Sequence, residues 1–246
     1  MGIHTTDAIV LRRYPYRETS VIVTCLTERY GKLKGLVKGL CVQPNRHRSP
    51  MEPMTVNRIV FYDTASSQLH LIGQCELLKP LSGLARDVET LTLAAQCVEV
   101  ADAALPLEEP QPNSYRLLRQ ALECLDGGTD DAHALKAHFI VRLLRLAGFQ
   151  PQLDECTGCS RRLQEHGYWS PRHGGLLCAR CLHEDPHAEG IRAELLEALG
   201  QLAEAEELMP LPEAVATSLC ERLEIFLRWH LHHPLKTMKT NGMRKI

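Results

Sequence analysis

Residues 20–40 read SVIVTCLTERYGKLKGLVKGL, and this stretch decides the fold of the amino-terminal third of the chain. In its first part Val21 and Val23 share one face, and this two-residue period is that of a β-strand. After a turn, Leu33 and Lys34 fall on opposite faces of a second segment with the same period. The pattern therefore predicts two neighbouring strands joined by a short turn.

The first eighty residues contain three more segments of this kind. The five expected strands cover residues 8–11, 20–26, 32–40, 56–62 and 69–77. A connection with three prolines, residues 41–55, separates the third strand from the fourth. Five short strands with turn residues between them favour a small barrel or sandwich. A small five-stranded barrel with a basic face is what an OB-fold offers to single strands of nucleic acid.

Beyond residue 81 the spacing of apolar residues becomes helical. A first helix is expected to end before Pro106, because proline cannot continue a helix. Further helices are expected over about 114–125, 131–147, 190–208 and 212–232. The second half of the chain is therefore mainly helical, apart from a segment at 151–187 that has little periodicity.

Charge is distributed unevenly along the chain. The 246 residues carry 28 Lys and Arg against 30 Asp and Glu, a net charge of −2. Residues 1–80 hold 11 basic and 6 acidic residues, a balance of +5, whereas 81–150 and 151–246 stand at −4 and −3. A basic segment in a near-neutral chain indicates an anionic partner bound by one face. Because no membrane-spanning or secretory segment is found, we expect a cytoplasmic protein.

Two pairs of cysteines stand out in the segment without periodicity. Each pair encloses two residues, and the pairs are eighteen residues apart. Two residues between ligands let one tight turn direct both thiolates at one ion, which is the spacing of a tetrahedral zinc site. A rubredoxin-like iron site shares the pattern, since ligation by four sulfurs does not select one metal. We predict one zinc ion, with the ligands Cys156, Cys159, Cys178 and Cys181.

The expected role of this zinc is structural. Catalytic zinc usually keeps an open position, whereas four thiolates close the coordination shell. A zinc deaminase is excluded, since the His-x-Glu element that it needs before the cysteines comes after them, at His187 to Glu189. His166, His173 and His183 are alternative ligands, but we interpret them as loop residues.

These features together predict an α+β multidomain chain. It consists of a five-stranded OB-fold barrel followed by an α-helical domain with an inserted four-cysteine zinc element. The expected parts are the OB-fold nucleic-acid-binding domain over 1–80, the first helical part over 81–150, the zinc element over 151–187, and the second helical part with a basic tail over 188–246.

The amino-terminal segment holds a cluster of basic residues within 37 positions. The predicted DNA-binding residues are Arg12, Arg13, Arg17, Lys32, Lys34, Lys38, Arg46 and Arg48. The three lysines are separated by even numbers of residues along the strand, so their side chains should project from one strand face. Cations interleaved with tyrosines suit a groove that follows phosphates and stacks bases. Tyr14 and Tyr16 are interpreted as core or turn residues and do not belong to the predicted contact set.

The basic cluster also has a simpler interpretation, a solvated strand face whose lysines discourage edge pairing. This alternative accounts for any one of the residues, but the cluster as a whole favours nucleic acid. No P-loop, dinucleotide-binding, nucleophile-elbow or His-Glu-x-x-His motif occurs in the chain. We therefore expect a binding protein and not an enzyme.

Three stretches carry a resemblance to a known family. They are TDAIVLRRYPYRETSVIVTCLT at 6–27, YGKLKGLVKG at 30–39, and LKTMK at 235–239 after a long helix. The order of parts, barrel, helices, cysteine knuckles and helices, matches over nearly the whole chain. In these features the chain resembles the RecO family of bacterial DNA repair and recombination mediators.

The resemblance implies an amino-terminal OB-fold, a helical domain and a zinc element in members that keep the cysteines. It also implies binding of single- and double-stranded DNA, annealing of complementary strands, and a nucleoid-associated place in the bacterial cytoplasm. The implied partners are RecR and single-strand-binding protein, in the loading of RecA onto coated strands. The DNA contacts that it carries over are Arg12, Arg13, Lys32, Lys34 and Lys38.

Two other functions stay open at this point. OB-folds and zinc knuckles also serve RNA, so an RNA-binding or ribosome-associated zinc protein is the first alternative. A protein-interaction scaffold is the second, with the acidic helical region as the binding surface and the basic face incidental.

Overall fold

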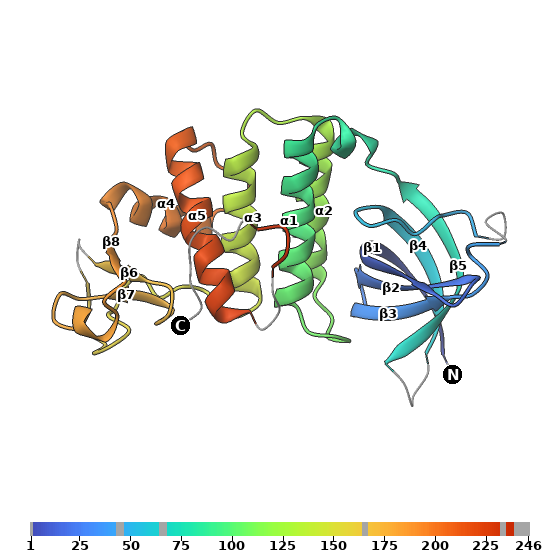
Figure 1. Ribbon diagram of the computed structural model, residues 1–246, viewed down its shortest axis with the longest axis horizontal. Coiled ribbons are helices and arrows are strands. Elements are labelled where there is room, and N and C mark those ends of the chain that lie inside the picture. The colour runs from blue at the N-terminus through green and yellow to red at the C-terminus, as the bar shows by residue number, and fades with distance from the viewer. Residues whose placement is uncertain (1, 43–46, 64–67, 164–166, 232–234, 239–246) are drawn as a thin grey trace. The chain divides into compact units, whose positions relative to one another are not determined.

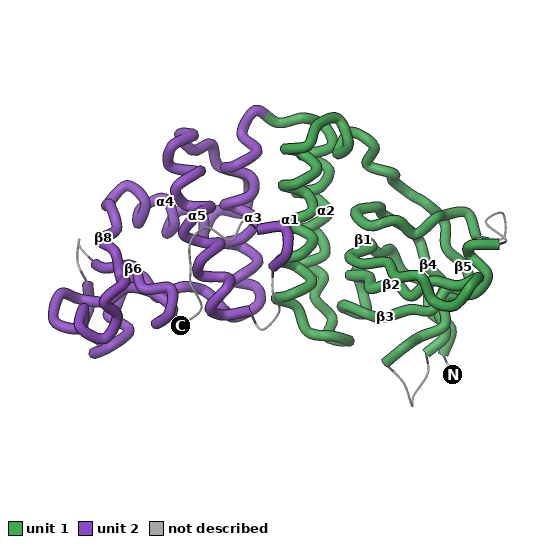
Figure 2. The backbone as a smooth tube through the Cα atoms, viewed as in Figure 1, with its two compact units in different colours: residues 1–129 green, residues 130–246 purple. Residues whose placement is uncertain are grey.

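The computed structural model describes residues 2–42, 47–63, 68–163, 167–231 and 235–238. The chain forms two compact units, residues 1–129 and residues 130–246 (Figure 2). The division into four parts made from the sequence is finer than these units and stays a prediction.

The first unit begins with a closed five-stranded barrel (Figure 1). Its strands are β1 (Ile3–Tyr16), β2 (Ser20–Thr27), β3 (Gly31–Val37), β4 (Val56–Tyr62) and β5 (Leu69–Lys79). They follow the order β1-β2-β3-β5-β4, with β3 and β5 parallel and the other pairs antiparallel. The predicted OB-fold barrel is confirmed. β1 extends well beyond the apolar run at 8–11, because its polar ends pair with neighbouring strands while their side chains face solvent.

The core of the barrel follows the alternation read from residues 20–40. Val21, Val23 and Cys25 on β2 point inward, and they meet Leu33 and Val37 from β3 in one buried cluster. Burying an aliphatic side chain of this size contributes about 1.5–3 kcal/mol, so this interior supplies much of the barrel's stability. The side chains between these core positions therefore form the outer surface of the barrel.

Helices cover part of that outer surface. The first unit contains η2 (Ser82–Ala85), α1 (Val88–Ala104) and α2 (Pro112–Gly127). Asp87 caps α1 by accepting a hydrogen bond from the backbone N–H of Thr90 at 2.7 Å. α1 packs against β1 and α2 against β2, and accordingly the outward-facing Ile9 and Leu26 are fully buried.

The second unit combines three helices with a small sheet. Its elements are α3 (Ala132–Leu146), β6 (Tyr168–Ser170), β7 (Gly175–Leu177), η3 (Leu182–Glu184), β8 (Glu189–Gly190), α4 (Ala193–Glu204) and α5 (Glu213–His230). The helices confirm the sequence prediction, whereas the sheet, in the order β7-β6-β8, was not predicted. Strands of two or three residues are too short to show a two-residue period. Among the described residues, no helix is long and apolar enough to cross a membrane.

Candidate nucleic-acid interface and metal centre

The outer surface of the barrel carries two rows of side chains that cross four strands. Residues opposite each other in neighbouring strands place their side chains on the same face. The first row consists of Arg12 on β1, Thr24 on β2, Lys34 on β3 and Leu69 on β5. The second row consists of Tyr14, Ile22, Leu36 and Leu71 on the same strands. These eight residues are called the groove face below.

An open hollow of about 450 Å³ lies in the groove face. Its lining residues are Tyr14, Ile22, Thr24, Lys34, Gln68 and Leu69. Tyr14 is 49% exposed, and Lys34 is also exposed. An aromatic ring beside aliphatic side chains provides a stacking surface for a base, while a nearby ammonium can contact its phosphate. The hollow therefore has the chemical composition of a site for one or two nucleotides.

Arg12 lies at the edge of this hollow and has two partners. Its guanidinium forms an ion pair with the carboxylate of Asp102 on α1, and Nη1 donates to the hydroxyl of Tyr14 at 3.4 Å. Partial burial works against its charge, but the contacts with Tyr14 and Asp102 outweigh this and raise the pKa of Arg12. Arg12 is therefore a fixed cation with an exposed edge, beside an exposed ring.

Lys32 shares the outward direction of Lys34 but is covered by α1. Its side chain is buried, with Nζ at 3.3 Å from Oδ1 of Asp102, and it also donates to the Asp102 backbone carbonyl. Burial lowers the pKa of Lys32, and Asp102 opposes this effect. The three predicted lysines thus leave the barrel on one side, but Lys32 offers no free charge to the surface.

Two of the remaining predicted contacts lie close to one end of the groove face. Arg17 is exposed in the β1–β2 turn, with its guanidinium carbon 5.2 Å from the centre of the Tyr16 ring. Lys38 is exposed directly after Val37, which pairs with Val21. A backbone hydrogen bond of 3.0 Å, from Cys41 to Thr19, brings the two turns together. These two cations extend the groove face beyond the row of Tyr14.

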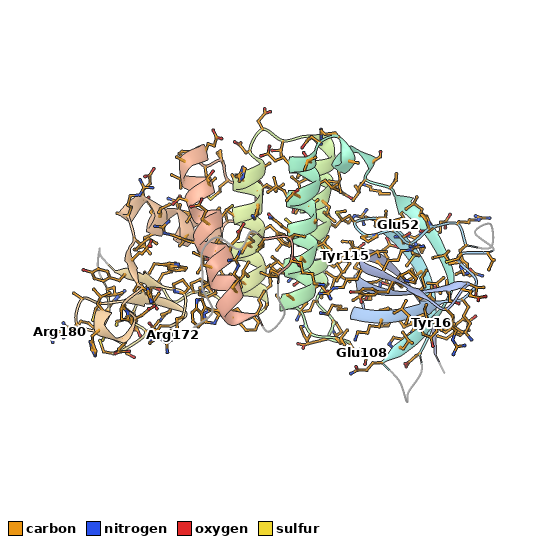
Figure 3. The ribbon with its side chains drawn as sticks, in the orientation of Figure 1. Tyr16, Glu52, Glu108, Tyr115, Arg172 and Arg180 are labelled. Carbon is orange, nitrogen blue, oxygen red and sulfur yellow. The ribbon has the colours of Figure 1, made fainter. Side chains whose placement is uncertain are left out.

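Arg13 and Arg48 lie elsewhere on the barrel. Arg13 is opposite the core residue Val23, so it leaves β1 on the other side from Arg12, and its Nε is 3.7 Å from a carboxylate oxygen of Glu52. Figure 3 labels Glu52 and Tyr16 on the barrel, at separate positions. Arg46 lies outside the described residues. The structure thus brings Arg12, Arg17, Lys34 and Lys38 to one side and separates Arg13 and Arg48 from them.

Arg48 belongs to a row of alternating charges, here called the charge ladder, on the β1–β4–β5 side of the barrel. Arg58 on β4 binds Asp7 on β1 through two contacts, at 2.8 and 3.3 Å. Arg58 also pairs in register with Glu76 on β5, and Arg48 lies 3.9 Å from the Glu76 carboxylate. Each cation of the charge ladder has an acidic neighbour, whereas Lys34 on the groove face forms no ion pair with any residue that the structure describes.

The four predicted metal ligands come together in the second unit. Cys156 and Cys159 lie in the loop before β6, while Cys178 follows β7 and Cys181 precedes η3. Their sulfur atoms all lie within 4.8 Å of one another, and those of Cys159 and Cys178 are 3.8 Å apart. Zinc–sulfur bonds of about 2.3 Å in a tetrahedron place the sulfurs about 3.8 Å apart, so the cluster has the right size for one ion.

The surroundings of the cluster favour the thiolate form at Cys156 and Cys178. Burial works against a charge on Cys156, but the N–H groups of Cys178, Gly158 and Cys159 outweigh it and lower its pKa to about 6. The N–H of Cys181 lowers the pKa of Cys178, whereas burial and neighbouring thiols raise that of Cys181. Four thiolates side by side repel one another unless a cation lies between them. The donor set and its spacing therefore fit a tetrahedral divalent metal ion.

The histidines considered as alternative ligands are engaged elsewhere or lie outside the described residues. A ring nitrogen of His173 is 4.0 Å from a carboxylate oxygen of Glu184, and Nδ1 of His183 is 2.8 Å from the carbonyl oxygen of Arg180. Arg180 is labelled in Figure 3. His166 falls outside the described residues. Within the part of the chain that the structure describes, the four cysteines are the group that can hold a metal.

Sequence reasoning missed one residue of the groove face, Tyr14, and one buried residue next to it, Asp102. Tyr14 is absent from the predicted contact set, although it lies two positions from Arg12 on one strand and therefore shares its face. Asp102 lies 70 residues from Lys32, in a helix whose position on the barrel no local pattern reveals. The two-residue spacing from Arg12 could have predicted the position of Tyr14, whereas nothing in the sequence pointed to Asp102.

These observations define a class of protein: an OB-fold protein with an exposed cationic and aromatic groove, and a second unit that carries a four-cysteine metal-binding cluster. Comparison with known proteins then identifies the family. Residues 1–81 match the model of the recombination protein O N-terminal domain, and residues 85–239 match that of its C-terminal domain. The chain belongs to the RecO family.

Several relatives support this assignment. A protein of Desulforudis audaxviator is 32% identical over 205 residues, which cover 83% of this chain and 80% of the relative. A protein of Moorella thermoacetica is 34% identical over 73% of this chain and 67% of its own length. A Nocardioides protein is 30% identical over 96% of this chain and 98% of its own. All three carry the name DNA repair protein RecO.

Proposed function

We propose that this protein is a non-enzymatic recombination mediator in DNA repair. In this proposal it binds single- and double-stranded DNA, anneals complementary strands, and acts with RecR to load RecA onto DNA coated by single-strand-binding protein. The observation that carries the proposal is the groove face of a RecO-family chain, where Tyr14 and Lys34 line one hollow and Arg12 lies in the same row as Lys34. The expected location is the bacterial cytoplasm, at the nucleoid.

The proposed contacts combine charge with stacking. Arg12, Lys34, Lys38 and Arg17 contact successive phosphates along one side of the barrel, and a base stacks on Tyr14. Contacts of this kind depend on the backbone and on ring faces, so they tolerate any base sequence. A mediator that acts on whichever strand is exposed by damage needs such tolerance. Arg13 and Arg48, which face carboxylates, are assigned no contact in this proposal.

Annealing on this surface needs no bond chemistry. Two complementary strands repel each other through their phosphates, and a cationic surface lowers this repulsion while it raises the local concentration of both strands. Base pairing then supplies the driving force, so nucleotide hydrolysis is not required. Displacement of a coating protein likewise requires only competing binding energy.

The metal in this proposal is one structural zinc ion held by Cys156, Cys159, Cys178 and Cys181. Zinc supplies no reaction step here. Cys156, Cys178 and Cys181 pack with Leu177, Leu163 and Tyr168 in a small cluster, in which thiolate–metal bonds take the place of an extensive apolar core.

Binding and annealing by the isolated protein, without nucleotide, test the proposal. If four cations each neutralise one phosphate, single-strand affinity falls roughly fiftyfold between about 50 and 200 mM salt. Annealing of complementary oligonucleotides should accelerate at the same protein concentrations that give binding. Competition with an RNA strand of equal length completes the test. Clear preference for RNA, or no binding at low salt, contradicts the proposal and favours an RNA-binding protein or a protein scaffold, respectively.

A further inference from the structure

Asp102 is a buried acidic residue to which the proposed contacts give no role. It lies on α1, is 6% exposed, and its carboxylate faces both Arg12 and Lys32. A buried carboxylate is costly unless cations or hydrogen-bond donors compensate its charge. Here two cations from two different strands converge on it, at the edge of the groove face.

Lys32 is the partner that compensates the charge of Asp102. Its ammonium contacts both the carboxylate and the backbone carbonyl of Asp102. Both side chains are buried, so neither is accessible to a phosphate. The Lys32–Asp102 pair is therefore an internal contact between β3 and α1, with no net charge of its own.

The backbone next to this pair is held firmly to the barrel. Just beyond α1, the N–H of Glu108 donates to the carbonyl of Lys32 at 2.7 Å. Gly31 has φ +69°, and a side chain there would collide with the carbonyl of Glu109. Figure 3 shows Glu108 beside this part of the barrel. The carboxylate of Asp102 is thus fixed relative to β1 and β3.

Arg12 uses one part of its guanidinium for these internal contacts. Nε contacts Asp102, and Nη1 points to the hydroxyl of Tyr14 at 3.4 Å. A guanidinium has five N–H groups, and the contacts of Nε with Asp102 and of Nη1 with Tyr14 use only part of them. The side chain is 40% exposed, and it contacts Tyr14, a residue that lines the hollow.

We propose that Asp102 is a positioning residue, which orients Arg12 for a phosphate and, through Arg12, the ring of Tyr14 for a base. Lys32 is then the charge partner of Asp102 and not a strand contact. This inference rests on the proposed function of the groove face. It assigns the two lysines of β3 different tasks: Lys34 binds the strand, and Lys32 compensates the buried charge of Asp102.

A variant that tests this role has to keep the net charge of the face constant. Asp102→Asn alone removes a negative charge near the phosphates, which by itself strengthens binding. The pair Lys32→Met and Asp102→Asn removes one charge of each sign and keeps side chains of similar size. Neutral replacement of a buried ion pair is often tolerated by the fold. Arg12 keeps its charge in this variant and loses its fixed partner.

The experiment is a cycle of four proteins: wild type, the pair variant, Arg12→Ala, and the three changes together. Single-stranded DNA binding is measured at about 50 and 200 mM salt, with circular dichroism melts to confirm folding. We expect the pair variant to bind about fivefold more weakly than wild type with the same salt dependence, since coupled neighbours interact at this scale. In the Arg12→Ala background the pair should have no further effect.

Each outcome of this cycle has a defined meaning. An equal loss in both backgrounds, or no loss in either, overturns the positioning role while the proposed function stands. No binding by wild type overturns both. If the pair variant does not fold, Asp102→Glu replaces it in the cycle, because it keeps the charge but displaces the carboxylate. The same result is expected: Asp102→Glu weakens DNA binding when Arg12 is present and has no further effect in the Arg12→Ala background.

Discussion

The groove face and the cysteine cluster are built in opposite ways. The groove face brings together side chains from four strands, and its residues lie as far apart as Arg12 and Leu71 in the chain. The cluster uses two short turns, Cys156 to Cys159 and Cys178 to Cys181, on a sheet with strands of two or three residues. The first depends on a packed barrel core, whereas the second, in the proposal above, depends on a bound ion.

This difference separates recognition from stability. The groove residues lie on the outer side of strands whose inner side is the apolar core, so they can change without unfolding the barrel. The cysteines are themselves the centre of their small cluster, so their loss removes what holds it together. Changes at the two sites should therefore have separable effects, on DNA binding in one case and on local structure in the other.

The largest expected effect follows the loss of a metal ligand. Cys178→Ser should lose most of the bound zinc, and the segment 151–187 should become sensitive to protease, because structural zinc contributes about 10–16 kcal/mol in small zinc domains. Metal analysis and limited proteolysis measure both effects. Cys41→Ser, at an exposed cysteine of the first unit, is the matched control. Full zinc content in the variant would show that the ligand set is wrong.

Charge reversal on the groove face should have the next largest effect. Lys34→Glu with Lys38→Glu should weaken single-strand binding roughly a hundredfold at about 50 mM salt, since each reversal replaces an attraction to phosphate by a repulsion. Both side chains are exposed, so melting should be unchanged. Arg161→Glu with Arg162→Glu makes the same change at exposed positions of the second unit. An equal loss in both doubles would indicate a response to total charge and not to the groove.

Replacement of the ring in the groove should have a moderate effect. Tyr14→Ala should weaken single-strand binding about tenfold, because stacking of one base on an aromatic side chain contributes about 1–3 kcal/mol. Its salt dependence should stay that of wild type, since no charge is removed. Tyr14→Phe keeps the ring and should bind within about twofold of wild type. Unchanged binding by the alanine variant would place the bases elsewhere.

The charge ladder should show the smallest effect. Arg48→Ala should leave single-strand affinity within about twofold of wild type, because exposed ion pairs such as that with Glu76 contribute little and Arg48 is not on the groove face. A fluorescence titration at about 50 mM salt is sensitive enough to test this. A loss as large as that of the Lys34 and Lys38 double variant would mean that the strand runs over the ladder side of the barrel.

The sequence predicted the local features well. The strand period of residues 20–40 placed the core and surface sides of β2 and β3 correctly, and the cysteine spacing identified the metal-binding cluster. Both signals involve residues that are close in the chain. The five barrel strands and the helices were confirmed for the same reason, with errors mainly at element ends, such as the polar extensions of β1.

The features that depend on distant contacts were not predictable. The two-residue strand period assigned Lys32 to the surface together with Lys34, but α1 covers Lys32. The position of α1 depends on packing between segments 70 residues apart in the chain. Arg12 and Arg13 point in opposite directions as neighbours in any strand do, but which of them faces outward depends on a register irregularity between Val10 and Arg12. A cluster of basic residues in the chain thus overestimates the number of free cations on any one surface.

Photochemical crosslinking tests the central claim most directly. A single-stranded oligonucleotide with 5-iodouracil is bound to the wild-type protein, irradiated, and the crosslinked peptides are identified by mass spectrometry. The account predicts crosslinks at Tyr14 and in the peptides of β1 to β3, and their loss in the Lys34 and Lys38 double variant. Crosslinks confined to residues 130–246, or on the charge ladder, would contradict the assignment of the groove face as the strand-binding surface.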